Sequence, residues 1–330
     1  MRIEAFSEGK YLDDPDANED AFLILPGRGY AVIDGVTDIS GRMIDGMRSG
    51  RLASRIVQQA AAGYLCSTQA AKGEVGDVIA VVSKALRDAY ARYGVLDEVQ
   101  AHPARRFGAT MTLALDMGAM FRFILVGDSG LRLNAAETFV ADDGLDAVTA
   151  TLRQQAYRLV AEAGGDLEAQ RRVSRLCSFH GAATVHPEMR PWLDEERRAQ
   201  LHRTSLASCA ARFPAAPASD IAKLLDQGIS GQTRFQNNTL SPFSYSVFDG
   251  FGIPMALVKV IDRPRAALRT IELYTDGYFR RGATPDPAAW ETAFEEVERL
   301  DPEKIGPYAS VKGSSERMRT DDRTVVIVQF

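Results

Sequence analysis

The sequence predicts an α+β fold in which antiparallel sheets are covered by helices. Three pairs of apolar, β-rich runs are each interrupted by a tight turn signal, which is the pattern of a β-hairpin. The pairs are Ala21–Leu25 with Tyr30–Ile33, Ala109–Asp116 with Met120–Val126, and Ser244–Phe248 with Met255–Val260. No strand–helix–strand rhythm runs through the chain, which argues against a doubly wound parallel sheet.

The remaining elements follow in chain order from the spacing of apolar residues. Apolar residues at helical spacing predict helices over Gly50–Ser67, Val78–Tyr93 and Pro287–Arg299, and β-rich runs predict strands over Leu131–Leu133, Thr270–Thr275 and Thr324–Phe330. Residues 145–227 are rich in Ala, Arg, Glu and Gln at helical spacing and predict several helices, with a break around Phe213–Pro217. No repeat or flexible linker is visible, so we expect a single domain over 1–330 that includes a mainly helical segment at about 145–229.

Composition limits the partners and the compartment. The chain has 330 residues with 39 Lys and Arg against 44 Asp and Glu, a net charge of −5 that provides no basic stripe for nucleic acid. Cys66, Cys177 and Cys209 are too scattered for a disulfide framework or a zinc site and are typical of a reducing compartment. The N-terminus lacks a signal-peptide pattern, and no apolar run approaches the roughly 20 residues of a membrane span. We therefore expect a cytoplasmic protein that binds neither nucleic acid nor membrane; the sequence leaves its oligomeric state undetermined.

Acidic residues stand at the ends of most of the predicted strands. They are Asp34 in AVIDG, Asp128 in FILVGDSG, Asp276 in IELYTDG, Asp321 and Asp322 in TDDRTVVIV, and Glu19 and Asp20 in NEDAF. Any one of these sites alone is better explained as a turn. Carboxylates gathered at one sheet edge would repel each other unless cations neutralise them, and an all-oxygen donor set selects hard ions such as Mg²⁺ or Mn²⁺.

The order of these motifs resembles the metal-dependent serine/threonine protein phosphatases, the PPM or type 2C family, in a divergent bacterial-type form. NEDA, VIDG, GATMTLAL with FILVGDS, LYTDG and DDRTVVIV follow one another from Asn18 to Val328 in the family's order. The resemblance implies a four-layer α-β-β-α sandwich of two antiparallel sheets flanked by helices. It also implies a binuclear metal centre of two Mg²⁺ or Mn²⁺ ions, with a position for a third.

The resemblance assigns roles to individual positions. Asp34 and Asp276 would be the main catalytic carboxylates, with Asp34 bridging two ions and the Gly35 carbonyl on one of them. Asp276 and Asp321 would complete the other ion's shell, with Asp322 at a position where the family has Asn. The other acidic positions would be Glu19, holding its metal through water, Asp20, supporting the site from nearby, and Asp128, at a third metal.

Two departures from the family pattern concern the phosphate and the leaving group. The family's phosphate-binding Arg, four residues before the Glu, is Pro15 here, which leaves Arg42, Arg48 and Arg51 as candidates to supply the charge; each is at least equally well explained as a solvated charge at a helix start. The His that follows the first Asp-Gly in many members is Val36. Asp38 nearby is either a helper ligand or, as we favour, a turn residue.

These assignments imply a phosphoric monoester hydrolase acting on phosphoserine and phosphothreonine in proteins, with a metal-bridging hydroxide as the nucleophile. Two alternatives stay open at the level of sequence. Pro15 and Val36 favour a pseudophosphatase that acts as a regulatory protein-binding module. A phosphatase for a small phosphate ester would differ from the leading hypothesis only in its substrate.

Overall fold

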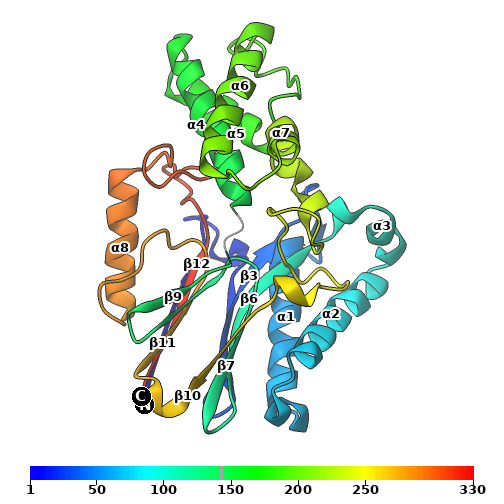
Figure 1. Ribbon diagram of the computed structural model, residues 1–330, viewed down its shortest axis with the longest axis vertical. Coiled ribbons are helices and arrows are strands. Elements are labelled where there is room, and N and C mark those ends of the chain that lie inside the picture. Colours follow the sequence, from blue (N-terminus) through cyan, green and yellow to red (C-terminus); the bar gives the residue numbers. More distant parts are fainter. Residues whose placement is uncertain (142–143) are drawn as a thin grey trace. The chain divides into compact units, whose positions relative to one another are not determined.

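The computed structural model describes residues 1–141 and 144–330, and its contacts divide them into two compact units (Figure 1). The sheet unit takes the described residues of 1–142, 245–296 and 317–330, and the helical unit takes those of 143–244 and 297–316. No helix in these described ranges is both long enough and apolar enough to cross a membrane.

The sheet unit contains two five-stranded antiparallel sheets. The first sheet has the order β1 (Arg2–Glu8), β12 (Arg323–Gln329), β11 (Thr270–Tyr274), β8 (Gly130–Leu133) and β9 (Glu137–Phe139). The second has the order β10 (Lys259–Pro264), β7 (Met120–Val126), β6 (Gly108–Asp116), β3 (Gly29–Val36) and β2 (Ala21–Leu25). A separate two-stranded ribbon joins β4 (Met43–Ile44) to β5 (Met47–Arg48).

Three apolar layers hold this unit together. Between the two sheets lie the side chains of one cluster, including Val32, Phe123, Leu273 and Val326. The outer face of the second sheet packs against α1 (Ser49–Cys66) and α2 (Val75–Arg92), which α3 (Leu96–Ala101) follows. The outer face of the first sheet packs against α8 (Pro287–Leu300) through Trp290 and Phe294. The layers are therefore α-β-β-α, as Figure 1 shows for the labelled strands and helices, and the predicted fold class is confirmed.

The helical unit consists of four main helices. They are α4 (Leu145–Glu162), α5 (Leu167–His180), α6 (Glu195–Arg212) and α7 (Ala218–Gln227). Asp166 and Asp194 begin α5 and α6 as N-caps, each accepting a hydrogen bond of 2.8 Å from a backbone N–H of the first turn. The break that the sequence predicts at Phe213–Pro217 lies between α6 and α7. Short 3₁₀ helices elsewhere in the chain cover Pro15–Ala17, Thr68–Lys72, Pro103–Arg105, Gly228–Phe235, Met255–Leu257 and Arg265–Ala267.

One predicted hairpin is wrong. Ser244–Phe248 forms isolated bridges rather than a strand, one of them between Phe248 and Ala109, and Met255–Leu257 is a 3₁₀ helix. Pro254 has no N–H for a strand ladder and precedes that 3₁₀ helix directly. The strand of this region is β10, displaced toward the C-terminus, and it pairs with β7.

The sequence also fails to predict β1, the first strand of the chain. Its residues are mostly half-buried rather than cleanly alternating, so period two is weak. The strand pairs along its whole length with β12, from Arg2 opposite Gln329 to Glu8 opposite Arg323. A partner more than 300 residues away along the chain leaves no local signal in the first ten residues.

The three cysteines give a direct test of burial. Burial raises the pKa of Cys177 to about 12 and also raises that of Cys209, whereas Cys66 is exposed. Because the thiolate is the reactive form, we expect Cys66 to react with an aromatic disulfide reagent at pH 8 at least about 100-fold faster than the other two. In guanidinium, where the protein is unfolded, all three thiols should react with the reagent at the same rate. Rapid labelling of Cys177 or Cys209 in the folded protein would contradict this packing.

Candidate metal and phosphate site

Strand pairing brings the acidic residues to one edge of the sheet unit. Asp34 lies at the end of β3, opposite Thr110 of β6, and Met111 of β6 is opposite Val126, the last residue of β7. Asp128 therefore follows β7 at the edge where Asp34 lies. The start of β2 lies at the same edge, because Ala21 pairs with Ile33, and this places Glu19 and Asp20 there.

The first sheet contributes its acidic residues from two neighbouring strands. Tyr274, the last residue of β11, pairs with Val325 near the start of β12. Asp276 follows β11, and Asp321 and Asp322 precede β12. Because β11 and β12 are antiparallel neighbours, the three side chains come from the same end of the pair. The Thr275 hydroxyl of this sheet donates to Asp20 Oδ2 at 2.8 Å, which joins the acidic ends of the two sheets.

The pKa of Asp34 depends on four of these carboxylates. Burial raises the pKa of Asp34 well above its ordinary value, and the negative charges of other carboxylates raise it further. Those carboxylates, from the strongest contribution to the weakest, are Asp276, Asp20, Asp321 and Asp128. Strand pairing places these carboxylates at one edge, and their charges act on Asp34 there.

Asp20 is almost completely buried within the same group. Burial raises its pKa well above the ordinary value, and the charges of Asp322 and Asp276 raise it further. Its Oδ2 atom accepts the bond from Thr275, whereas its Oδ1 atom is buried without a hydrogen-bond partner among the described residues. A buried carboxylate oxygen without a donor is costly unless a cation lies near it.

Two glycines allow the backbone to pack closely beside the carboxylates. A Cβ atom added at Gly35 would lie 2.3 Å from the carbonyl oxygen of Gly50, and one added at Gly50 would lie 2.6 Å from Glu19 Oε1. Both contacts are shorter than real Cβ atoms permit. The end of β3 and the start of α1 are thus pressed together around Glu19, whose Oε1 also accepts a hydrogen bond from the Thr37 hydroxyl.

The three candidate arginines have different surroundings. Arg42 Nη2 donates to Glu98 at 2.8 Å, and Arg48 lies over the Tyr11 ring with 5.0 Å to its centroid. Arg51 Nη1 donates to the carbonyl oxygen of Asn18, the residue before Glu19. Burial lowers the pKa of Arg51, and the charges of Asp322 and Glu19 oppose that change. Of the three, Arg51 is the one held beside the acidic edge.

Asp38 serves the turn after β3. Its Oδ1 accepts from the backbone N–H of Ser40 at 2.8 Å, and its Oδ2 accepts from the Ser49 hydroxyl at 3.2 Å. Arg42 Nε lies 3.8 Å from the same Oδ2. These bonds connect the turn to the start of α1, which agrees with the turn interpretation.

The structure adds a residue that sequence reasoning missed. Lys10, which is 8% exposed, places its Nζ 2.8 Å from Glu19 Oε2, 2.8 Å from Asp322 Oδ2 and 3.5 Å from Asp321 Oδ1. Lys10 therefore forms ion pairs with the buried carboxylates of Glu19 and Asp322. A lysine after an unpredicted strand gives no local signal, and only the pairing of β1 with β12 brings it to this edge.

The donor set suits a hard divalent cation in its chemistry. All the converging ligands are carboxylate oxygens, and Asp20 Oδ1 lacks a donor among the described residues. The carboxylates are not spaced as metal ligands, however. Within 1–141 and 144–330, no three His, Cys, Asp or Glu side chains are placed to hold a metal ion as they stand. The carboxylates would have to close around an ion, which their mutual repulsion prevents until the ion arrives.

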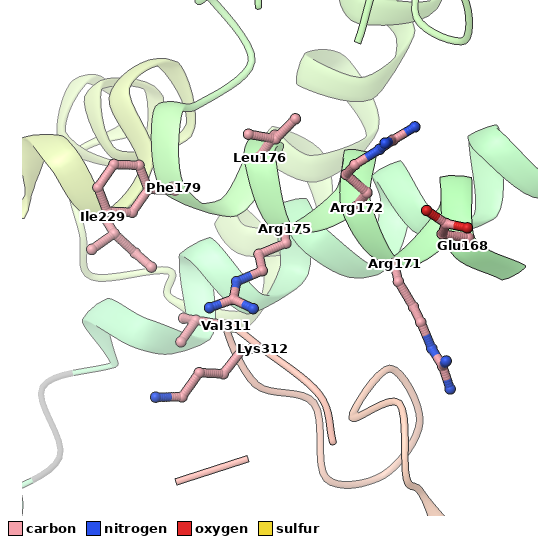
Figure 2. A pocket seen from close by; sticks show the side chains of 9 residues that line it. All are labelled: Glu168, Arg171, Arg172, Arg175, Leu176, Phe179, Ile229, Val311 and Lys312. Carbon is pink, nitrogen blue, oxygen red and sulfur yellow. The ribbon is translucent and has the colours of Figure 1, made fainter. Parts of the chain in front are cut away.

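A separate cavity of about 580 Å³ lies in the helical unit (Figure 2). It has apolar walls, which include Leu176 and Phe179, and a mostly basic rim, which includes Arg171 and Arg172. Arg171 is paired with Glu303, and Arg172 Nε lies 3.1 Å from Glu188. None of the acidic residues predicted for the metal site lines this cavity.

Solved structures of bacterial phosphatases align with the chain over nearly its whole length, at low sequence identity. The chain aligns over 100% of its length with 98% of the Mycobacterium tuberculosis serine/threonine phosphatase PstP/Ppp, at 15% identity and a TM-score of 0.44. The chain is similar to bacterial serine/threonine phosphatases. It also aligns over 100% of its length with 95% of Stp1 from Staphylococcus aureus, at 12% identity and a TM-score of 0.45.

A further solved structure, the catalytic domain of PstP in complex with two manganese ions, matches 99% of the chain over 96% of its own length, at 16% identity and a TM-score of 0.40. No protein-family model and no curated protein sequence matches the chain. Identities this low leave the function to be inferred from the side chains of the site itself.

Proposed function

We propose that this chain is a divalent-metal-dependent phosphatase that hydrolyses phosphoserine and phosphothreonine in proteins. The observation that carries the proposal is the set of carboxylates around Asp34, whose charges act on one another from the ends of separate strands. A structural turn needs one such residue, whereas repulsion among five carboxylates is costly, and a bound cation would relieve it. The order of motifs along the chain supports the same function.

The proposed roles follow the predicted positions. Asp34, the Gly35 carbonyl, Asp276 and Asp321 would hold the ions, with Glu19 acting through water. Asp128 would serve a third ion, and Asp20 would support the site through its bond to Thr275. When bound, the ions lower the pKa of water and offset the charge of the phosphoryl group.

Two features of this chain shape the rest of the reaction. Arg51, held by the Asn18 carbonyl beside Glu19, is the best-placed of the three arginines to orient a phosphate. Val36 is exposed and has no proton to donate. The leaving serine or threonine oxygen would therefore take its proton from water.

A regulatory binding module is the second candidate, and two observations favour it. Lys10 already occupies one oxygen of Glu19 at 2.8 Å, and in the described part of the chain the carboxylates lack metal-site spacing. Such a protein would retain the fold but would turn over no phosphate ester.

Metal dependence tests the proposal directly. We expect the purified protein to hydrolyse p-nitrophenyl phosphate and phosphoserine peptides with millimolar Mn²⁺ or Mg²⁺, and EDTA to reduce both rates by about 100-fold or more. Release of p-nitrophenol and of inorganic phosphate measures the two reactions. Turnover of the aryl ester alone would indicate a small-ester phosphatase. No turnover with metal present would favour the regulatory module.

A further inference from the structure

Lys10 is the cation that the fold itself supplies to the acidic edge. Its ammonium has three N–H donors and no acceptor, and it faces Glu19, Asp321 and Asp322. Its backbone N–H also donates to Asp322 Oδ1 at 2.7 Å. Lys10 therefore donates to both oxygens of Asp322, once from the backbone and once from the side chain, and the Glu19 N–H donates to Oδ2 as well at 3.3 Å.

The backbone fixes Lys10 in this place. Glu8, the last residue of β1, is opposite Arg323, so residues 9 and 10 continue alongside 321 and 322. The Lys10 carbonyl accepts from the Arg319 N–H at 2.8 Å, and the next residue, Tyr11, forms a bridge with Met318. The ammonium is consequently held at the acidic edge by pairing on both sides of it.

The charges of Lys10 and Asp322 offset each other. Asp322 is 2% exposed, and burial raises its pKa while Lys10 lowers it. A buried carboxylate without such a partner is strongly destabilising, whereas a neutral amide at the same position needs no cation. Asp322 thus adds a buried negative charge to the acidic edge, and the ammonium of Lys10 lies against it.

The Lys10 ammonium also donates a hydrogen bond to Glu19. Glu19 Oε2 lies 2.8 Å from Lys10 Nζ, and Glu19 Oε1 accepts from the Thr37 hydroxyl, so both oxygens have donors without any ion. Asp321 is held less closely, at 3.5 Å. The chain itself thus supplies hydrogen-bond donors to the Glu19 side of the acidic edge, whereas other carboxylates raise the pKa of Asp34.

We propose that Lys10 is a built-in cation that occupies the Glu19 side of the site, so that a divalent ion binds there only by displacing it. This inference rests on the proposed function, and it predicts that the two ion sites differ in affinity. An ion beside Asp34 relieves the repulsion on a buried carboxylate that lies among other negative charges, and binds tightly. An ion beside Glu19 competes with an ammonium fixed by the backbone and binds weakly.

The test removes both charges together. Lys10→Met alone would leave Asp322 buried without a cation, so the informative variant is Lys10→Met with Asp322→Asn, which keeps the side-chain volumes. Titration with Mn²⁺, followed by electron paramagnetic resonance of the free ion, should show one tight and one weak ion in the wild-type protein. In the double variant the weaker ion should bind at least about tenfold more tightly.

A matched control applies the same exchange on the surface. Lys84→Met with Asp88→Asn removes an exposed ion pair of 2.5 Å on α2 and should leave both Mn²⁺ affinities unchanged. Equal Mn²⁺ binding by the wild-type and the folded Lys10 double variant would overturn the role of Lys10 and leave the phosphatase proposal standing. Absence of Mn²⁺ binding in both proteins would overturn both proposals.

A measurement on the wild-type protein covers the case in which the double variant does not fold. Displacement of Lys10 by the second ion should expose its amine, so acetic anhydride labelling of Lys10, read by peptide mass spectrometry, should rise severalfold at saturating Mn²⁺. Lys84, already exposed, serves as the internal reference. Binding of two ions with no change in Lys10 labelling would contradict displacement.

Discussion

Replacing Asp34 by asparagine is expected to reduce Mn²⁺-dependent hydrolysis of p-nitrophenyl phosphate by about 100-fold or more. Asp34 is the group on which the charges of Asp276, Asp20, Asp321 and Asp128 converge. An amide of the same shape keeps one oxygen but loses the charge that would bind and bridge divalent ions. Initial rates at saturating Mn²⁺ measure the effect.

The same variant should not lose stability without metal. Burial and neighbouring negative charges both disfavour the Asp34 carboxylate, so a neutral amide removes repulsion from the acidic edge. We expect its metal-free thermal midpoint to equal or exceed that of the wild-type protein, by calorimetry in EDTA. Asp276→Asn should behave alike, and the exposed Asp88→Asn should change neither rate nor midpoint. An active Asp34→Asn or Asp276→Asn variant would remove that residue from the proposed site while leaving the fold intact.

Replacing Arg132 by alanine is expected to lower the free energy of unfolding by about 3–5 kcal/mol. Arg132 of β8 is opposite Glu272 of β11, and its Nε lies 2.8 Å from Glu272 Oε1. Its Nη1 also donates to the Gly282 carbonyl at 2.7 Å. Glu272 is fully buried, so alanine would leave its charge without a cation. Urea unfolding followed by tryptophan fluorescence measures the change.

A second substitution separates the buried charge from lost packing. Trp290 Nε1 donates to Glu272 Oε2 at 2.9 Å, and Glu272→Gln can keep an acceptor for that bond. In the Arg132→Ala background, Glu272→Gln should recover about 1–2 kcal/mol because the unpaired charge is gone. If the double variant proved less stable than Arg132→Ala alone, packing rather than charge would explain the loss.

Much of the fold could be predicted because its elements carry local signals. The turn at Pro26–Gly29 and the apolar runs beside it predict β2 and β3, and the structure confirms them. The hairpin predicted across Asp249–Gly252 failed because similar signals, followed by Pro254, produced a loop and a 3₁₀ helix. Apolar runs and Asp-Gly turns therefore indicate a hairpin only where backbone N–H groups remain free to pair.

In the candidate site, too, some features can be predicted from the sequence and others depend on the tertiary structure. The sequence by itself determined that Asp34, Asp128 and Asp276 each follow an apolar run, since a strand and the residue after it are neighbours along the chain. Tertiary structure alone decided that these side chains share one edge, because the register of separate strands sets the distances between them. It also decided the role of Lys10, whose partners Asp321 and Asp322 lie more than 300 residues away along the chain and only strand pairing brings them into contact.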